Sequence, residues 1–218
     1  MRLILATRNA HKLEELRALF SAPELEMEDA HAVPGAPDVE EVGVTFTENA
    51  VLKAEALAHA ANGWAMADDS GLEVDALNGE PGVRSARYAG AHGDHPANIA
   101  RVLEGLKAHP LPAARTARFV CALALARPDF PTLTLTATCE GVIAPAPRGT
   151  GGFGYDPIFI PEGHARTFGE MSNEEKNLLS HRGRALRLAR ERWLPWLVAW
   201  ARRDAAAEGG NSRGRNNT

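Results

Sequence analysis

Carboxylates occur in two adjacent pairs that could bind a metal ion. Glu40-Glu41 lies in a polar stretch, whereas Asp68-Asp69 directly follows the apolar residues 64–67. Neighbouring carboxylates repel one another unless a cation or hydrogen-bond donors offset their charge. Oxygen ligands suit Mg²⁺, which takes one or two protein carboxylates and leaves its other positions to water and substrate phosphates. Acid pairs are also common on surfaces, and the alternative for the second pair is a turn capped by Asp68.

Phosphate binding is the second chemistry that the sequence indicates. Thr7 and Asn9 stand between the apolar residues 3–6 and a segment with helical periodicity, and Lys12 follows three residues later. Backbone amides and polar side chains at a helix N-terminus bind phosphate, and a lysine there can clamp the charge. The alternative is a helix cap with a solvated lysine. The sequence contains no Walker A pattern.

A glycine cluster at residues 149–154 contains the letters G-x-G-x-x-G. A dinucleotide site needs a helix that opens at those glycines, and residues 155–161 (YDPIFIP) cannot start one. We therefore interpret the cluster as a flexible loop that presents Phe153 as a stacking platform and Asp156 as a hydrogen-bond acceptor. An ordinary wide turn is the alternative.

The elements that would position these residues begin with a strand and then a helix, which favours an α/β or mixed architecture. We predict strands at residues 3–6, 25–28 and 64–67, with the third strand stopping at Asp68. The long loop at residues 33–44 contains Glu40-Glu41 and is expected to be functional or mobile.

Helix signals follow this loop. Thr45 and Glu48 have the spacing of a capping box, and Asn49 and Lys53 share one face of the helix that they open. A further helix is predicted at about residues 96–107.

An antiparallel hairpin is predicted from strand-like residues 118–125 and 133–142, so the sheet should be mixed. Ser172 and Glu175 form another capping box, which opens the last long helix. Residues from about 205 onward lack periodicity and are expected to be disordered.

The two cysteines are expected to be free and buried. Cys121 and Cys139 lack Cys-x-x-Cys spacing and the density of a secreted disulfide scaffold. If Arg127 pairs with Thr132 in the hairpin, Cys121 falls opposite Thr138, and Cys139 then points to the other face of the sheet. Free thiols favour a cytosolic location.

Composition narrows the class of protein further. The chain has 218 residues, 44% of them hydrophobic, and a net charge of -4, which suits a globular protein and does not favour nucleic-acid binding. No apolar run approaches the roughly 20 residues of a membrane span, and the start turns polar too early for a signal peptide.

Six motifs, taken in order, resemble the inosine/xanthosine triphosphate pyrophosphatase family. They are Thr7-x-Asn9-x-x-Lys12, Phe46-x-Glu48-Asn49-Ala50-x-x-Lys53-Ala54, Ala67-Asp68-Asp69-Ser70-Gly71-Leu72, Pro81-Gly82-Val83-Arg84-Ser85-Ala86-Arg87-Tyr88, Gly152-Phe153-Gly154-Tyr155-Asp156-Pro157 and Ser180-His181-Arg182. The set is specific, whereas any single member is not. One departure is Arg8, which stands where many members carry glycine.

The resemblance implies a mixed-sheet, elongated, two-lobed α/β fold with the active site in the cleft between the lobes. Residues 1–204 would form this single domain, and residues 205–218 a tail without a family counterpart. It further implies a cytoplasmic homodimer that uses Mg²⁺ to hydrolyse noncanonical purine nucleoside triphosphates (ITP, dITP, XTP) to the monophosphate and pyrophosphate.

The resemblance also implies roles for individual residues. Asp69 would be the catalytic acid/base, and Glu40 and Asp69 would hold the metal. The substrate-binding residues would be Thr7, Arg8, Asn9, Ala10, His11, Lys12, Lys53, Ser70, Phe153, Gly154, Tyr155, Asp156, Lys176, His181 and Arg182.

Two alternatives remain open from the sequence. The chain could be a pyrophosphatase for a pyrimidine or another modified nucleotide, which a substrate panel would reveal. It could also be a nucleotide-binding sensor without turnover, although a phosphate pocket has little need of carboxylates unless a metal is bound.

Overall fold

A six-stranded mixed sheet organises the chain in the structure, a computed structural model that describes residues 1–7, 10–109 and 114–212. The strand order is β2-β1-β3-β4-β5-β6, with β1 parallel to β2 and β3 and the remaining pairs antiparallel. The strands are β1 (Arg2–Leu5), β2 (Glu26–Asp29), β3 (Trp64–Val74), β4 (Thr116–Arg127), β5 (Phe130–Ile143) and β6 (Phe159–Pro161).

Helices cover both faces of this sheet. The α-helices are α1 (Ala10–Phe20), α2 (Phe46–Ala61), α3 (His95–Gly105), α4 (Asn173–Leu179), α5 (His181–Arg192) and α6 (Leu194–Ser212). Short 3-10 helices are η1 (Ala30–Ala32), η2 (Asp75–Leu77), η3 (Gly82–Arg87), η5 (Asp156–Ile158) and η6 (Phe168–Glu170).

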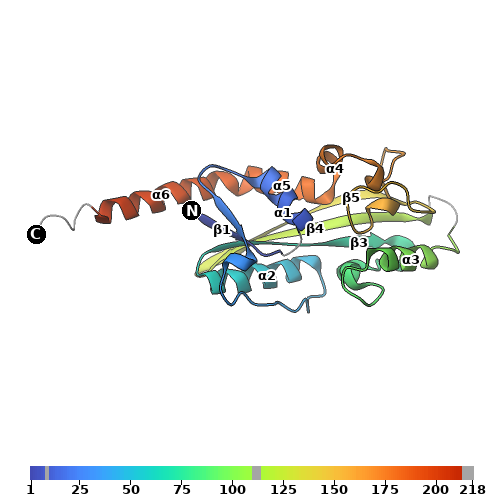
Figure 1. The fold of residues 1–218 in the computed structure, drawn as a ribbon, viewed down its shortest axis with the longest axis horizontal. Coiled ribbons are helices and arrows are strands. Elements are labelled where there is room, and N and C mark those ends of the chain that lie inside the picture. The colour runs from blue at the N-terminus through green and yellow to red at the C-terminus, as the bar shows by residue number, and fades with distance from the viewer. Residues whose placement is uncertain (8–9, 110–113, 213–218) are drawn as a thin grey trace, which may run out of the picture.

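The long strands β3, β4 and β5 run the length of the body and join its two lobes (Figure 1). In one lobe α1 and α5 lie on one face of the sheet and α2 lies on the other, while α3 and α4 flank the opposite end (Figure 1). The elongated, mixed α/β fold with two lobes that the resemblance implied is therefore confirmed.

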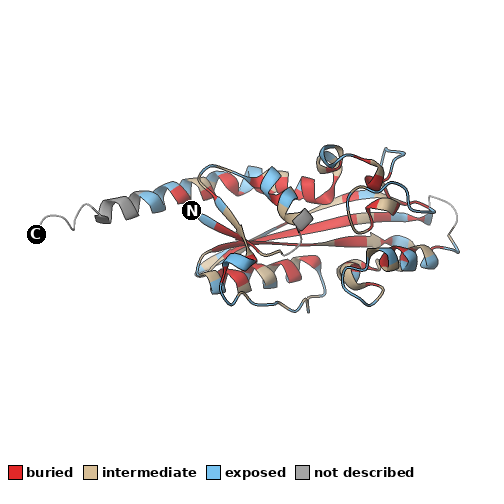
Figure 2. Ribbon diagram, viewed as in Figure 1, coloured by how far each residue is buried: buried red, intermediate tan, exposed pale blue. Residues whose placement is uncertain are grey.

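Each lobe has its own buried apolar side chains. Leu16 of α1 and Leu186 of α5 belong to one cluster, whereas Leu57 of α2 belongs to a second cluster on the other face of the sheet. Val102 of α3 and Phe159 of β6 belong to a third cluster in the second lobe. Figure 2 shows the buried residues running along the strands between these clusters. Rigid cores on both sides therefore flank the middle of β3.

The third predicted strand does not stop at Asp68. β3 continues through Asp68 and Asp69 to Val74, and ten of its residues pair with β4. The sequence prediction was wrong because buried carboxylates in a strand need charged partners, and these come from distant parts of the chain. The acids therefore lie within a rigid strand rather than on a turn.

The predicted hairpin is confirmed, but its register differs from the prediction. Arg127 pairs with Phe130, and an irregularity after Leu125 shifts the ladder, so Cys121 lies opposite Ala137. The tight turn is possible because Asp129 adopts a positive φ of 64°. Cys121 and Cys139 are both free and buried, as expected, but they lie on the same face of the sheet and not on opposite faces, because Phe119 pairs with Cys139 and Cys121 with Ala137.

The C-terminal segment is three helices rather than one. The capping box of Ser172 and Glu175 opens α4, as predicted, and Ser180 then caps α5. Helix α6 continues beyond Asp204 to Ser212, through the alanine-rich residues 205–207, which favour helix. Among the described residues, no helix has the length and hydropathy needed to cross a membrane.

Candidate active site

The middle of β3 borders the site because its neighbour β1 is short. β1 pairs with β3 only as far as Met66, and the amide of Ala6 makes one further bond to the Met66 carbonyl. Beyond that point none of the described residues forms a strand beside this edge of β3, and Asp68, Asp69 and Ser70 line a cavity there. Thr7, at the carboxyl end of β1, lines the same space.

Asp68 is an ionised anchor for two cationic side chains. Lys12 Nζ and Arg182 Nε each donate to its carboxylate, the second at 2.9 Å. Asp68 is only 2% exposed. Burial alone would raise its pKa, but the charges of Arg182 and Lys12 outweigh burial and hold the pKa of Asp68 well below its ordinary value. Asp68 therefore joins α1 and α5 to the sheet.

Asp69 has a different environment on the other side of the strand. Lys53 Nζ donates to Asp69 Oδ1 at 2.7 Å, and Asn49 Nδ2 donates to Oδ2 at 3.3 Å. Both partners come from α2, where the sequence predicted that they share a face. Burial raises the pKa of Asp69, and although Lys53 opposes this, the Glu41 charge adds to the increase. A carboxylate with a raised pKa is suited to accept a proton.

The acid pair on the loop before α2 is split between two environments. Glu41 is half-buried and accepts from Lys53 Nζ at 3.1 Å and from Arg87 Nη1 at 2.8 Å. Burial alone would raise the pKa of Glu41, but Lys53 and Arg87 lower it. Glu40 is exposed and lines the same space as Asp69. Lys53 thus bridges Glu41 and Asp69.

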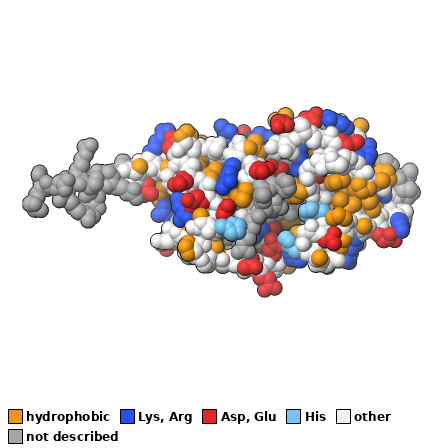
Figure 3. Space-filling view, in the orientation of Figure 1, with side chains coloured by type: hydrophobic (Ala, Val, Ile, Leu, Met, Phe, Trp, Pro, Cys, Tyr) orange, Lys and Arg blue, Asp and Glu red, His pale blue; other side chains and the backbone are white. Residues whose placement is uncertain are grey.

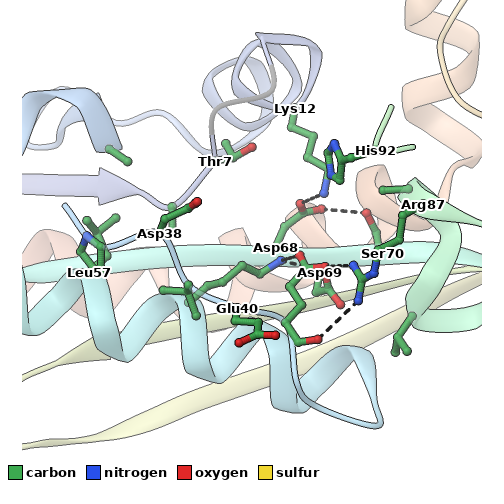
Figure 4. Close-up of a pocket in the computed structure, with 18 residues that line it drawn as sticks. Thr7, Lys12, Asp38, Glu40, Leu57, Asp68, Asp69, Ser70, Arg87 and His92 are labelled. Carbon is green, nitrogen blue, oxygen red and sulfur yellow. Dashed lines mark hydrogen bonds and ion pairs between the residues drawn. The ribbon is translucent and has the colours of Figure 1, made fainter. Parts of the chain in front are cut away.

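These groups line a cavity of about 720 Å³, here called the central cavity. Figure 4 shows Lys12 and Asp68 on one side of β3 and Asp69 and Glu40 on the other, with Arg87 and His92 at one end of the cavity. In the space-filling view, charged and histidine side chains gather in the middle of this face (Figure 3). The central cavity offers cationic and anionic groups together, as a metal-bound polyphosphate requires.

A second space of about 200 Å³, here called the aromatic cavity, adjoins the first. Its lining includes Phe119, Phe153 and Tyr155, and Lys12, Ser70 and His92 border both cavities. An elongated ligand with a charged end and a flat end would fit across this boundary.

His181 is a neutral group in the aromatic cavity. Its ring stacks on Phe119 with the centroids 4.7 Å apart. Burial lowers the pKa of His181 well below its ordinary value, and the charges of Arg182 and Lys176 act in the same direction. The buried Nδ1 atom has no hydrogen-bond partner among the described residues. A buried polar atom without a partner lowers the stability of the fold unless a ligand or a water molecule forms a hydrogen bond with it.

The predicted stacking loop is fixed by Asp156. This buried carboxylate accepts from the Phe153 amide at 2.7 Å and from Lys176 Nζ at 2.8 Å. Lys176 in turn lies 4.6 Å from the centroid of the Phe153 ring. Burial raises the pKa of Asp156 in spite of Lys176. Asp156 therefore holds the loop in shape rather than projecting freely into the cavity.

Most of the predicted site residues lie along the two cavities. The central cavity is lined by Thr7, Lys12, Glu40, Lys53, Asp69 and Ser70, and the aromatic cavity by Phe153, Gly154, Tyr155, Asp156, Lys176, His181 and Arg182. Arg8 and Asn9 lie outside the described residues. Ala10 and His11 open α1, but their side chains are not described.

Several residues of the site were not assigned by sequence reasoning. Arg87 lies in the motif at residues 81–88, but the sequence assigned it no role, and the resemblance assigned the metal to Glu40 and not to Glu41. Glu15 accepts from Arg182 Nη1 at 2.6 Å, and its position one helical turn after Lys12 was the signal that could have found it. His92, to which no role was assigned from the sequence, borders both cavities.

Comparisons with known proteins agree with this geometry. The sequence model of the Ham1 family matches residues 3–192. A dITP/XTP pyrophosphatase of Geobacillus kaustophilus is 51% identical over 191 residues, which cover 88% of this chain and 93% of that protein. One of Streptomyces coelicolor is 54% identical over 188 residues, covering 85% and 94%. The solved structure of the Staphylococcus aureus Ham1 protein superposes with a TM-score of 0.80 at 41% identity, covering 88% of this chain and 97% of that one. The match extends over nearly all of both lobes, and the chain belongs to the Ham1 family.

Proposed function

We propose that this protein hydrolyses noncanonical purine nucleoside triphosphates, such as dITP, ITP and XTP, to the monophosphate and pyrophosphate. The relatives named as dITP/XTP pyrophosphatases support the substrate class. The observation that carries the proposal is the continuity of a charged cavity of about 720 Å³ with an aromatic one of about 200 Å³. The triphosphate would occupy the central cavity and the base the aromatic cavity.

In the proposed chemical step, Asp69 accepts a proton from the attacking water. Water attacks the α-phosphorus, the bond to the bridging oxygen breaks, and pyrophosphate leaves with that electron pair. General-base assistance of this kind contributes about 10²- to 10⁴-fold. The raised pKa of Asp69 supports this role, and the low pKa of Asp68 supports an anchoring role instead.

Cationic side chains would neutralise the leaving group. Lys12 and Lys53 line the central cavity, and Thr7 lies at the end of β1 beside them. By resemblance, the segment of Arg8, Asn9, Ala10 and His11 would contribute backbone and side-chain donors to the same phosphates. Ser70 lines both cavities and would bind where the nucleotide crosses between them.

The donor set of the central cavity fits Mg²⁺. The described residues contain no cluster of three or more His, Cys, Asp or Glu side chains that could hold a metal ion. They do contain two carboxylates, Glu41 and Asp69, that share one ammonium group, Lys53 Nζ. Mg²⁺ needs only one or two carboxylates when phosphates and water supply the rest, and when bound it would neutralise charge on the phosphate oxygens.

We assign Asp69 and the Glu40-Glu41 pair to the metal. The resemblance supports Glu40, which lines the cavity and is exposed. The shared Lys53 contact supports Glu41 as an additional ligand. Their separate effects on Mg²⁺ dependence, measured in E40Q and E41Q, distinguish the two glutamates.

Base selection follows from hydrogen-bond polarity. Hypoxanthine and xanthine present an acceptor at the six-position oxygen and a donor at the adjacent nitrogen, whereas adenine reverses both. His181 Nδ1, which has no partner among the described residues, and the neighbouring Arg182 would pair with the oxo-purine edge. Adenine would leave His181 Nδ1 unpaired, which can discriminate by about 10⁴-fold. Phe153 would stack on any purine.

The test is a substrate panel with product identification. The purified protein is incubated with ITP, dITP, XTP, ATP and CTP, each with and without Mg²⁺, and the released species is identified. Pyrophosphate from the oxo-purine nucleotides, dependent on Mg²⁺ and at least about 10²-fold faster than from ATP, is the expected result. Orthophosphate as the product, preference for CTP, or binding without turnover would each contradict the proposal.

The resemblance further supports a homodimer that acts in the cytosol. Sedimentation equilibrium of the full chain tests the oligomeric state. The free, buried thiols of Cys121 and Cys139 are consistent with a reducing compartment.

A further inference from the structure

Glu41 lies on an irregular segment and needs outside contacts to fix its side chain. Residues 33–45 connect η1 to α2 without a strand or helix. Backbone contacts near Glu41 include Gly43 N to Asn49 Oδ1 at 2.8 Å and Val44 N to Glu48 Oε2 at 2.8 Å, but these leave the Glu41 side chain free to rotate. Lys53 holds one carboxylate oxygen, and the other requires a second donor.

Arg87, the last residue of η3, supplies that donor. Its Nη1 donates to Glu41 Oε2 at 2.8 Å, and its Nη2 reaches the Glu41 backbone carbonyl at 3.4 Å. The guanidinium thus grips both the side chain and the main chain of one residue. The planar guanidinium holds its N–H donors in a fixed arrangement that suits the carboxylate and the carbonyl of Glu41 at once. The lysine ammonium lacks this arrangement, so arginine and lysine are not equivalent here.

The backbone on both sides of Arg87 is held in place by contacts with β3, Tyr155 and α3. Ser85 Oγ accepts from the Leu72 amide of β3 at 2.9 Å, and the Tyr155 hydroxyl donates to the Ser85 carbonyl at 2.9 Å. Buried Asn98 of α3 donates to the Ala86 carbonyl at 3.3 Å and accepts from the amide that follows Tyr88 at 2.7 Å. The end of η3 is therefore fixed to β3 and α3 before Arg87 reaches across to Glu41.

We propose that Arg87 is a positioning residue that holds Glu41 opposite Asp69, so that both carboxylates can face one divalent cation. This inference rests on the proposed function for its biological meaning, because it deepens the metal assignment of that site. Arg87 does not need to touch the substrate to act in this way. Its loss would free Glu41 to follow the irregular segment toward solvent, and the cation would lose an oriented ligand.

The test measures cation binding without substrate. Mn²⁺ serves as the probe, and the unbound ion is quantified by electron paramagnetic resonance in the presence of the full chain. Removal of a residue that orients a metal ligand typically weakens metal binding about 10- to 100-fold. We expect R87A to raise the Mn²⁺ dissociation constant by that factor and R87K to recover part of it. The matched control is R84A, because Arg84 lies on the same 3-10 helix but pairs with Glu80 and not with Glu41.

A double-substitution cycle separates positioning from other roles. If Arg87 acts through Glu41, R87A should change Mn²⁺ binding by less than about twofold when Glu41 is already Gln. Circular dichroism and urea unfolding of R87K confirm that the fold is intact. Unchanged Mn²⁺ binding in R87A, an equal loss in R84A, or a full effect of R87A in the E41Q background would each overturn the inference, as would wild-type protein that does not bind Mn²⁺.

The design also separates this inference from the proposed function. A wild-type protein that fails to release pyrophosphate from ITP contradicts the function, while the Mn²⁺ measurement still decides the role of Arg87. Turnover of ITP with Arg87-independent Mn²⁺ binding contradicts only the inference.

Discussion

Asp68 and Asp69 are adjacent on β3, yet their carboxylates engage opposite faces of the sheet. Asp68 binds Lys12 of α1 and Arg182 of α5, whereas Asp69 binds Lys53 of α2. Successive side chains of a strand alternate in direction, so two neighbouring acids can have different partners. Because of this alternation, Asp68 acts as a structural anion, whereas Asp69 is available as the proposed proton acceptor.

The two acids should therefore respond differently to the same substitution. In D69N, kcat is expected to fall by about 10²- to 10⁴-fold because the proton acceptor is lost. In D68N, Arg182 and Lys12 lose their shared anion, and breaking a buried pair of this kind costs about 3–5 kcal/mol of stability. Steady-state kinetics with ITP and urea unfolding of both variants measure the two effects. If D69N turns over normally, Asp69 is not the base.

The neighbouring glutamates should also separate in their Mg²⁺ dependence. E41Q is expected to raise the Mg²⁺ concentration for half-maximal activity by about 10- to 100-fold, because Glu41 shares Lys53 with Asp69. E40Q should shift it less, since Glu40 is exposed. Activity is titrated with Mg²⁺ at saturating ITP. A larger shift for E40Q would assign the metal to Glu40 and Asp69, as the sequence resemblance alone suggests.

Local signals in the sequence predicted the parts of the site that depend on local structure. Thr45 caps α2 through the Glu48 amide, as the spacing indicated, and this fixes the rotation of the helix. Asn49 and Lys53, four residues apart, consequently meet the same carboxylate. Helical periodicity depends only on residues that are close in the sequence, so it can be predicted from the sequence alone.

Contacts between distant segments could not be predicted in this way. Asp68 and Arg182 are separated by 114 positions, and Glu41 and Arg87 by 46. Without those partners, the acids after residues 64–67 looked like the end of a strand, because an unpaired carboxylate in a buried strand is unfavourable. The resemblance to a family implied that these segments meet at one active site, but it did not imply the role of Arg87.

The loop that carries Phe153 offers a test of backbone shape. Gly152 has a φ of +69°, and a Cβ there would lie 2.0 Å from Asp156 Oδ2. G152A should therefore displace Asp156 or Phe153 and raise the KM for ITP about 10- to 100-fold, because small misplacements at a binding site have effects of this size. The KM is measured by pyrophosphate release at constant Mg²⁺.

The control for this substitution is G163A. Gly163 also has a positive φ, +79°, but a Cβ there would meet nothing within 4 Å. Both variants bear the backbone strain of a left-handed alanine, and only G152A adds the contact with Asp156. Equal KM values in the two variants would show that the contact is unimportant for binding.

The buried imidazole of His181 predicts a pH dependence of stability. Burial holds its pKa in the folded state well below the ordinary value of 6.5, with the charges of Arg182 and Lys176 adding to the effect. Below pH 6.5 the unfolded chain binds a proton at this residue that the folded chain does not, so stability must fall as the pH falls. One such group contributes up to about 1.4 kcal/mol per pH unit.

Urea unfolding of the wild type and of H181N between pH 8 and pH 5 measures this contribution. At pH 8 the imidazole is neutral in both states, so the difference between the two proteins reports the packing of residue 181 alone. As the pH falls below 6.5, the free energy of unfolding of the wild type should decrease more than that of H181N, since asparagine does not titrate. A difference that stays constant over this range would mean that His181 takes up a proton in the folded protein. It would then act as a cation toward the base and not as the neutral group that the aromatic cavity contains.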